Sequence, residues 1–454
     1  MDFKNKNAAI LGFGVEGESV ANFLLTKKAH VSIFDVRKKE ALDADKIKLF
    51  EKAGAVFKFD KYPDSFEKYD FVVRSPGVSP TSTVIERIRE QRVEITSATK
   101  MFFDLCPCPI IGVTGTKGKG TTSTLIYEML RVQGSDVYLG GNIGISPLEF
   151  VDSLEKESVV VLELSSFQLA DLHKSPQIAV VLMVTSEHLD YHRDVAEYVD
   201  AKRNILRFQS KEDFAIVNHD YPASNESDVY TDGKVYKVSR EGAVEQGCFV
   251  KGDFICLKMG EREEKVMPVA DVLLPGRHNL ENVCAAILAA TIAGAQMEAI
   301  VSVIKTFKGL EHRLELVRLF NGVKYYNDSF STTPETAVAA IEAFEDPEIL
   351  ILGGSSKNSD FTELGKTIRE AKNIKAIIGI GDEWPRIRAT IDNSQLTAKI
   401  YEDCINMREV VQKAREVSTL GDIVILSPAC ASFDMFKNYK ERGKQFKDEV
   451  NALV

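Results

Sequence analysis

The sequence predicts an α/β protein with three domains, each built around a largely parallel sheet. Three observations lead to this prediction. Apolar runs that resemble strands alternate with helical segments, glycine-rich turns follow two of those runs, and 454 residues exceed what one hydrophobic core usually organises. We therefore expect domains over residues 1–97, 98–309 and 310–454.

The first domain opens with a strand, a glycine turn, a helix and a second strand. The expected elements are a strand over 8–13, the turn GFGVEG over 12–17, a helix over 18–27, a strand over 30–34 before Asp35, and a strand over 69–73 before Ser75-Pro76-Gly77. A glycine turn between strand and helix, with an acidic residue closing the next strand, is typical of a Rossmann-like unit. We expect this turn to hold a nucleotide or dinucleotide phosphate; a purely structural turn is the alternative.

The second domain carries the most informative motif, IIGVTGTKGKGTTST over residues 110–124. A β-branched run breaks into a glycine-rich loop that contains Lys117 and Lys119. Inward-facing backbone N–H groups beside a lysine suit a polyphosphate, and Thr121 or Thr122 can offer a hydroxyl to Mg²⁺. The motif predicts a P-loop-type, mononucleotide-binding parallel sheet with ATP as its ligand.

The spacing of this loop differs from the common G-x-x-x-x-G-K-[ST] pattern. Val113 stands where the first glycine belongs, and Gly120 directly follows Lys119. A glycine loop without a ligand is therefore the alternative for this segment taken alone.

Acidic and histidine side chains follow two further strands of this domain. Glu163 lies near the end of an apolar strand over 158–164, where a carboxylate beside a triphosphate could hold Mg²⁺. The segment TSEHLDYH over 185–192 follows a strand over 178–184. Because ligand sites gather at the carboxyl ends of parallel strands, we assign site roles to His188 and Asp190. Glu187 and His192 fit a solvated loop.

The remaining segments complete the predicted architecture. The polar, turn-rich stretch over 218–267 predicts a small antiparallel insertion, and an alanine-rich helix over 279–293 closes the second domain. In the third domain, strands over 348–352, 376–380 and 423–426 alternate with helical segments and predict another Rossmann-like sheet.

Charge and cysteine content limit the class of protein. A net charge of −10 argues against a general binder of nucleic acid or membrane surfaces, and neither a membrane-spanning run nor a signal peptide is recognisable. Seven cysteines are an odd number, and the Cys106-Pro107-Cys108 pair lacks the second pair of a zinc site. We expect reduced thiols in a cytoplasmic protein. Separately, we expect a monomer.

Five motifs, taken in order, resemble those of the Mur ligases. They are GTKGKGTT (115–122), LELSSFQL (162–169), SEHLDYH (186–192) with Ala201-Lys202 downstream, GRHNLEN (276–282) and Glu311-His312-Arg313. Asn327-Asp328-Ser329 and LSPACASFD (426–434) extend the likeness to the third domain and point to the glutamate-adding members. The resemblance covers nearly the whole chain.

The resemblance implies ATP-dependent amide formation in peptidoglycan synthesis. The γ-phosphate would pass to the carboxylate of UDP-N-acetylmuramoyl-L-alanine, and the amine of glutamate would attack the resulting acyl phosphate. Metal ions and lysines would neutralise the anions brought together. The GxGxxG unit would then hold a UDP-sugar rather than NAD.

The resemblance also implies roles for individual residues. The catalytic set is Lys119, Glu163, His188 and Lys202. ATP would be bound by Gly115, Thr116, Lys117, Gly118, Lys119, Gly120, Thr121, Thr122, Asn279, Asn282, Arg313 and Asp328. Two Mg²⁺ ions would be held by Thr121, Glu163, His188 and Lys202, the lysine as a carbamate. The UDP-substrate would contact Val15, Glu16, Asp35, Arg37, Gly77, Asn142 and His188, and the amino acid Thr332, Lys357, Ser432 and Phe433.

Three departures from the family pattern leave alternatives open. Gly120 replaces a hydroxyl residue after the loop lysine, Phe330 stands where a lysine is common, and Tyr439 replaces a phenylalanine. The last two lie near the expected amino-acid pocket, so a ligase that adds L-glutamate is the alternative to the favoured D-glutamate. A nicotinamide-dependent dehydrogenase is a more remote alternative that leaves the second phosphate loop unexplained.

Overall fold

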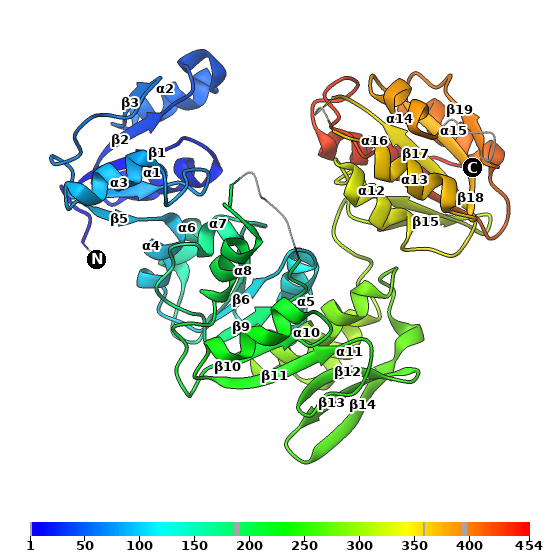
Figure 1. Ribbon diagram of the computed structural model, residues 1–454, viewed down its shortest axis with the longest axis horizontal. Coiled ribbons are helices and arrows are strands. Elements are labelled where there is room, and N and C mark those ends of the chain that lie inside the picture. Colours follow the sequence, from blue (N-terminus) through cyan, green and yellow to red (C-terminus); the bar gives the residue numbers. More distant parts are fainter. Residues whose placement is uncertain (1, 186–190, 357–358, 392–396) are drawn as a thin grey trace. The chain divides into compact units, whose positions relative to one another are not determined.

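A computed structural model describes residues 2–185, 191–356, 359–391 and 397–454. The chain divides into two compact units, one of residues 1–272 and 280–305, the other of residues 273–279 and 306–454. Within the described residues, the strands form sheets of five, nine and six strands, which follow one another along the sequence (Figure 1). The α/β class is therefore confirmed. The predicted boundary between residues 97 and 98 stays a prediction, because it falls inside the first unit.

The five-stranded sheet has the order β3-β2-β1-β4-β5, and all its pairings are parallel. Its strands are β1 (Asn7–Leu11), β2 (His30–Asp35), β3 (Val56–Phe59), β4 (Phe71–Arg74) and β5 (Glu94–Thr96), and its helices are α1 (Val15–Thr26), α2 (Ala44–Lys52) and α3 (Thr83–Glu90). The order places β1 and β4 side by side, so the glycine turn and the Ser75–Gly77 turn leave the same edge of the sheet. Ligands of open α/β sheets bind at this edge.

The nine-stranded sheet has the order β14-β13-β12-β11-β10-β9-β6-β8-β7. Its strands are β6 (Ile110–Thr114), β7 (Val137–Gly141), β8 (Val159–Glu163), β9 (Ile178–Val181), β10 (Phe214–Asn218), β11 (Lys234–Ser239), β12 (Gly247–Lys251), β13 (Phe254–Met259) and β14 (Arg262–Pro268). Strand β6 pairs in parallel with β8 and β9. The loops after β6, β8 and β9, which carry the predicted site residues, therefore leave one edge.

The stretch over 218–267 differs from the prediction of an antiparallel insertion. Strand β11 pairs in parallel with β10, and β12 pairs in parallel with β11, so the main sheet simply continues. Antiparallel pairing is confined to β13, which is antiparallel both to β12 and to β14. Short alternating strands look the same in sequence whether their partner is parallel or antiparallel, since register depends on distant pairing.

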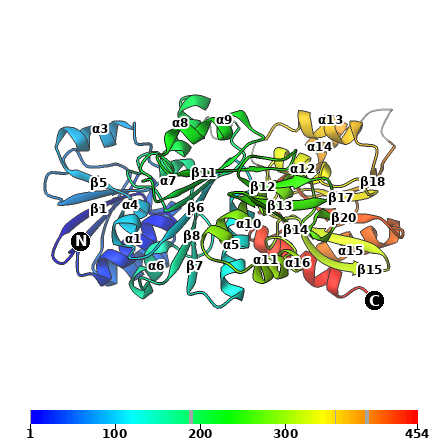
Figure 2. The ribbon, with the colours of Figure 1, turned by 90° about the horizontal axis from the view of Figure 1, so that it is seen from below.

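The helices of this region are α4 (Ala98–Leu105), α5 (Lys119–Val132), α6 (Pro147–Phe150), α7 (Ser166–Leu169), α8 (Val195–Arg203), α9 (Pro222–Asn225), α10 (His278–Ile292) and α11 (Met297–Ile304). Helix α11 packs against α5, and α10 lies near both (Figure 2). No helix in the described part of the chain has the length and apolar character needed to cross a membrane.

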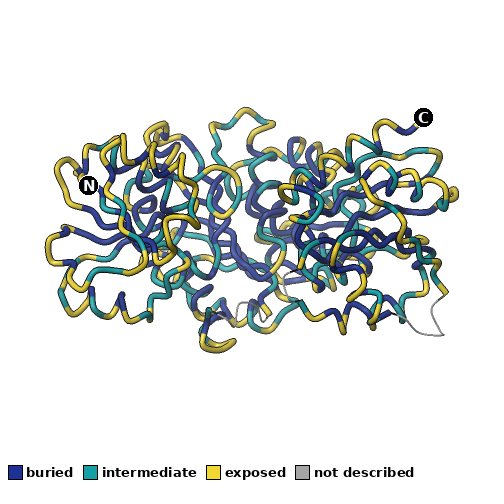
Figure 3. The backbone as a smooth tube through the Cα atoms, turned by 90° about the horizontal axis from the view of Figure 1, so that it is seen from above, coloured by how far each residue is buried: buried dark blue, intermediate teal, exposed yellow. Residues whose placement is uncertain are grey.

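The six-stranded sheet of the second unit has the order β15-β16-β20-β17-β18-β19. Its strands are β15 (Glu315–Phe320), β16 (Val323–Asn327), β17 (Glu348–Gly353), β18 (Ile374–Ile380), β19 (Lys399–Tyr401) and β20 (Ile423–Leu426), and its helices are α12 (Pro334–Ile341), α13 (Thr362–Glu370), α14 (Trp384–Ile391), α15 (Met407–Val417) and α16 (Tyr439–Asn451). Only β15 is antiparallel to its neighbour. The central strands of each sheet are buried, whereas many connecting loops are exposed (Figure 3).

Candidate active site

The predicted phosphate loop joins strand β6 to helix α5 within the first unit. Gly115 has a φ of 154° and Gly118 a φ of 86°, values that favour glycine. Helix α5 begins at Lys119, directly after Gly118, so its first N–H groups face the loop. This arrangement of strand, glycine loop and helix N-terminus is an anion site.

Gly118 also permits a close approach by helix α10. A Cβ added at Gly118 would lie 2.1 Å from Oδ1 of Asn282, far inside van der Waals contact. Asn282 is 4% exposed, so its side chain is held against the loop. The predicted ATP residue Asn282 therefore contacts the phosphate loop directly.

Two lysine ammonium groups converge on one carbonyl of the loop. Lys119 Nζ donates to the Gly115 carbonyl at 3.0 Å, and Lys202 Nζ donates to the same oxygen at 2.8 Å. Lys202 reaches the loop from helix α8 and is 2% exposed. Its Nζ lies 4.7 Å from the ring centroid of Tyr198 in the same helix. Lysine ammonium groups beside a glycine loop and a helix N-terminus suit an anionic ligand.

The hydroxyl groups of the loop and of the first turn of α5 are largely buried. Thr116 Oγ1 is hydrogen-bonded to the Tyr198 hydroxyl at 3.0 Å and accepts the N–H of Thr185 at 3.0 Å. Thr121 and Thr122 are buried, and Thr122 Oγ1 has no hydrogen-bond partner among the described residues. Gly120 is buried as well, whereas Lys117 is exposed.

Glu163 lies at the end of β8, the strand next to β6, and is 4% exposed. Asn142 donates its side-chain amide to Glu163 Oε1 at 3.0 Å and its backbone N–H to the Glu163 carbonyl at 2.9 Å. The structure thus joins a predicted substrate contact to a predicted metal ligand.

The available donors fit Mg²⁺ bound together with a nucleotide. A carboxylate at Glu163 and hydroxyls at the start of α5 are hard oxygen donors, which Mg²⁺ prefers. Among the described residues, no cluster of three or more His, Cys, Asp or Glu side chains could hold a metal alone. Phosphate oxygens of ATP would complete the coordination, as is usual for Mg²⁺ sites of this type.

The segment after β9 only partly falls within the described residues. His188, Asp190 and Glu187 lie outside them. His192 was expected in a solvated loop, and this prediction is wrong: the side chain is 2% exposed and shares a 2.9 Å hydrogen bond with Ser166 Oγ. Its ring stacks on Phe167, with centroids 5.8 Å apart, and also contacts the rings of Tyr191 and Tyr198 edge to face.

The glycine turn of the first sheet is tight. A Cβ on Gly17 would lie 2.1 Å from the Gly12 carbonyl oxygen, so only glycine lets α1 pack against the turn. Asp35 closes β2 and accepts the Phe13 N–H at 2.8 Å and the Arg37 guanidinium at 2.7 and 2.9 Å. Burial alone would raise the pKa of Asp35, but these hydrogen bonds lower it below its ordinary value.

Three further predicted UDP contacts lie around this turn. Val15 is 84% exposed at the start of α1, and Gly77 is exposed in the loop after β4. Glu16 instead points toward the second sheet, where Gln168 donates to Glu16 Oε1 at 2.6 Å. Burial raises the pKa of Glu16 above its ordinary value, against the lowering effect of the Gln168 hydrogen bond.

In the second unit, Asp328 follows β16 and is buried. Its Oδ1 accepts the Leu314 N–H at 3.1 Å, and its Oδ2 accepts the Ser427 hydroxyl at 2.8 Å. Burial raises the pKa of Asp328 to about 7, although these hydrogen bonds oppose the shift. Arg313 lies over the Phe330 ring at 4.7 Å. Asn279, at the start of α10, donates to the Pro275 carbonyl at 2.6 Å.

The described amino-acid candidates follow strands at one edge of the third sheet. Thr332 follows β16 and is half-buried, while Ser432 and Phe433 follow β20, which pairs in parallel with β16. Ser432 is buried, whereas Phe433 is 72% exposed and donates its N–H to Ser355 Oγ at 2.9 Å. Lys357 lies outside the described residues.

The sequence analysis did not identify Arg442, whose side chain binds the backbone of these loops. It is fully buried and donates to the carbonyls of Ser329, Cys430 and Ala431 at 3.0–3.1 Å. Burial lowers the pKa of Arg442 to about 10. No local motif marks such a residue, because its acceptors are backbone carbonyls of other segments. The two departures Phe330 and Tyr439 contact each other edge to face, with centroids 5.3 Å apart.

The fold and the loop define a class. A glycine loop with two converging lysines and a buried carboxylate on the neighbouring strand are components of a nucleotide-dependent α/β enzyme.

Comparison with known proteins shows which family of enzymes the chain resembles. The chain matches the Mur ligase MurD-like N-terminal domain over residues 6–97, the Mur ligase middle domain over 113–290, and the Mur ligase glutamate ligase domain over 312–430. It is 40% identical to a UDP-N-acetylmuramoylalanine–D-glutamate ligase of Acetivibrio thermocellus, covering 99% of this chain and 97% of that protein. A protein of the same name from Symbiobacterium thermophilum is 38% identical, with 99% and 98% covered.

Solved structures show the same fold at low sequence identity. The UDP-N-acetylmuramate-alanine ligase of Thermotoga maritima is 17% identical, with a TM-score of 0.57 and 98% of this chain and 99% of that chain covered. A pseudomurein peptide ligase type C from Methanothermus fervidus is 17% identical, with a TM-score of 0.56 and 99% and 100% covered. The chain belongs to the Mur ligase family, whose members are ATP-dependent, amide-forming ligases.

Proposed function

We propose that this protein couples D-glutamate to UDP-N-acetylmuramoyl-L-alanine at the expense of ATP, in the cytoplasmic synthesis of peptidoglycan. The observation that supports this most is a glycine loop before helix α5 whose Gly115 and Thr116 carbonyls both accept a hydrogen bond from Lys119 Nζ at 3.0 Å. The names of relatives at 34–40% identity over nearly the whole chain support the choice of substrates.

The chemistry requires two anions to be brought together. A carboxylate oxygen of the UDP-substrate attacks the γ-phosphorus of ATP, which forms an acyl phosphate and releases ADP. The glutamate amine then attacks the carbonyl carbon, loses a proton, and expels inorganic phosphate as the amide bond forms. Lys119 lies where its ammonium can lower the repulsion in the first step, since it already donates to the loop that would hold the phosphates.

Two Mg²⁺ ions complete this proposal. When bound, they supply positive charge to the phosphates and the carboxylate. Glu163 and Thr121 would hold one ion with the nucleotide. His188, with Lys202 as a carbamate, would hold the second, because a carbamate converts the buried cation into an anionic oxygen ligand.

The UDP part would lie at the carboxyl edge of the first sheet, near Val15, Asp35, Arg37 and Gly77. Asp35 holds the Arg37 guanidinium beside the turn, so it would act by orienting that cation. We further propose that Arg313 contributes to ATP binding. We propose a monomer.

The decisive experiment measures phosphate release with ATP, Mg²⁺ and UDP-N-acetylmuramoyl-L-alanine, and with D-glutamate or L-glutamate in separate reactions. We expect release and a product larger by one glutamyl residue with D-glutamate alone. Equal or better turnover with L-glutamate would show that the protein is instead a ligase that adds L-glutamate to the same substrate. An absence of product with both enantiomers would refute it.

A further inference from the structure

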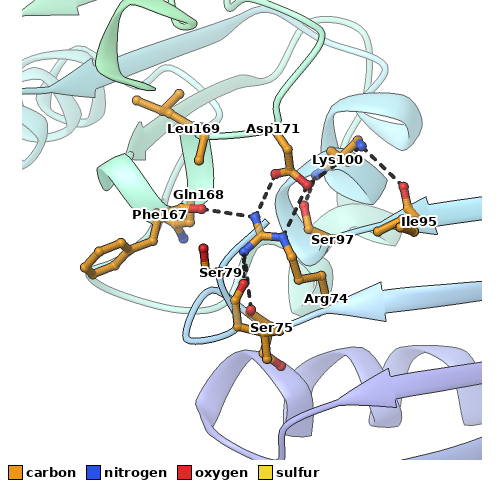
Figure 4. A network of polar contacts seen from close by, with 12 residues as sticks. Arg74, Ser75, Ser79, Ile95, Ser97, Lys100, Phe167, Gln168, Leu169 and Asp171 are labelled. Atoms are coloured by element: carbon orange, nitrogen blue, oxygen red, sulfur yellow. Dashed lines mark hydrogen bonds and ion pairs between the residues drawn. The ribbon is translucent and has the colours of Figure 1, made fainter. Parts of the chain in front are cut away.

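The first two sheets meet at a junction that contains a buried ion pair. Arg74, the last residue of β4, is 1% exposed on its side chain, and Asp171, which follows α7, is 14% exposed. The guanidinium donates to both carboxylate oxygens, at 2.7 and 3.2 Å (Figure 4). Lys100 Nζ lies 4.0 Å from the same carboxylate. A bidentate pair of this kind fixes orientation as well as distance.

Arg74 donates further hydrogen bonds to residues on both sides of the junction. On its own side it donates to the Val78 carbonyl at 2.8 Å and to the Ser75 carbonyl at 3.4 Å. On the other side it donates to the Phe167 carbonyl of α7 at 3.1 Å and to the Tyr191 hydroxyl at 3.4 Å. The guanidinium of Arg74 therefore connects the turn after β4 with the segment after β8.

These two segments carry different parts of the proposed site. The turn over 75–78 contains Gly77, a proposed contact of the UDP group. Helix α7 begins three residues after the end of β8, so Phe167 lies four residues from Glu163. Burial alone would lower the pKa of Arg74, but Asp171 raises it, so the cation is maintained at the junction.

Burying an ion pair costs desolvation free energy, and the bidentate geometry restrains the two side chains once the pair has formed. An unpaired buried cation carries a large desolvation penalty, and a pair offsets it only with good geometry and further hydrogen bonds. Arg74 has both. A second ion pair between described residues of this junction, Lys27 with Asp152, is exposed and therefore contributes little to stability. The buried pair is therefore a contact that can help to set the spacing of the two segments, beside the hydrogen bond from Gln168 to Glu16.

We propose that Arg74 is a positioning residue for the coupling reaction. Through Asp171 and the Phe167 carbonyl, it holds the turn that binds the nucleotide at a fixed distance from the segment that carries Glu163. The substrate must span this distance, with its UDP group at one end and its carboxylate at the other. This inference rests on the proposed function, since it concerns where that carboxylate lies relative to ATP.

The test uses Asp171→Asn in the full chain, because this change removes the charge across the junction and leaves the bonds from Arg74 to Ser75 and Val78 in place. We expect kcat/KM for UDP-N-acetylmuramoyl-L-alanine to fall about 100-fold, the loss typical of an ångström-scale misplacement. UDP lacks the acid end, so its inhibition constant should stay within twofold, as should the KM for ATP. The matched control, Asp152→Asn, removes the exposed pair at the same junction and should change none of these values.

A second variant keeps the test valid if Asp171→Asn does not fold. Arg74→Lys retains a cation opposite Asp171 but cannot reach the Phe167 and Val78 carbonyls together. We therefore expect kcat/KM to fall in this variant as well, while the inhibition constant of UDP stays within twofold. Unchanged kcat/KM in the folded variants would overturn the inference. An equal loss of UDP affinity would also overturn it, since Arg74 would then only shape the turn. If the wild-type protein forms no product, the proposed function fails and the inference falls with it.

Discussion

Replacing Gly118 by alanine tests whether the loop and helix α10 together hold the nucleotide. The new Cβ would lie 2.1 Å from Oδ1 and 2.9 Å from Cγ of Asn282, so the asparagine side chain must leave the loop. The φ of 86° adds a backbone penalty of about 1–2 kcal/mol for an L side chain. If Asn282 loses one hydrogen bond to ATP, worth about 1.5 kcal/mol, the KM for ATP rises roughly tenfold.

Helix α5 offers a matched control at its other end. Gly134 has a φ of 91°, and a Cβ there would meet nothing within 4 Å. Gly134→Ala should therefore lose about the same stability without changing the KM for ATP. The assay is phosphate release over a range of ATP concentrations, with thermal unfolding of both variants. A KM that stays within twofold of wild type in Gly118→Ala, or that rises equally in both variants, would refute this reasoning.

Three further predictions concern single side chains. Lys119→Ala should abolish ATP-dependent amide formation while circular dichroism stays unchanged; near-normal turnover would remove Lys119 from the site. Lys202→Ala should lose most activity and regain part of it with a small added carboxylic acid, which supplies the missing anion; an active variant without additive would contradict the carbamate. Glu348 is fully buried, and burial raises its pKa to about 8 from an ordinary value of 4.5. Its contribution to wild-type stability is present below about pH 4.5 and lost as the pH rises to about 8, by about 1.4 kcal/mol per pH unit. Glu348→Gln should therefore unfold at a higher temperature than wild type at pH 9, and an equal pH dependence in both proteins would be inconsistent with the shift.

Features encoded by neighbouring residues were predicted well. Strand β20 has the predicted bounds, and the glycine loop lies between β6 and α5 as its sequence indicated. Helix α1 begins at Val15 rather than at residue 18, because Gly14 already occupies the extended position before the first turn. These features depend on local hydrophobic pattern and backbone freedom, which a single sequence displays.

Features that join distant segments could not be predicted in this way. Arg74 and Asp171 are 97 residues apart, and nothing near either residue indicates its partner. His192 is covered by aromatic rings from α7 and α8, so its polar flanking sequence was misleading. The parallel pairing of β11 with β10 likewise depends on the path of the chain between them.

The central claim is that ATP activates the carboxylate of the UDP-substrate by phosphorylation. The most direct test labels that carboxylate with ¹⁸O and measures the mass of the phosphate released during coupling with D-glutamate. We predict that one ¹⁸O atom appears in the phosphate, because the acyl phosphate passes its bridging oxygen to phosphate when the amine attacks. Unlabelled phosphate from a reaction that forms the glutamyl product would contradict the account.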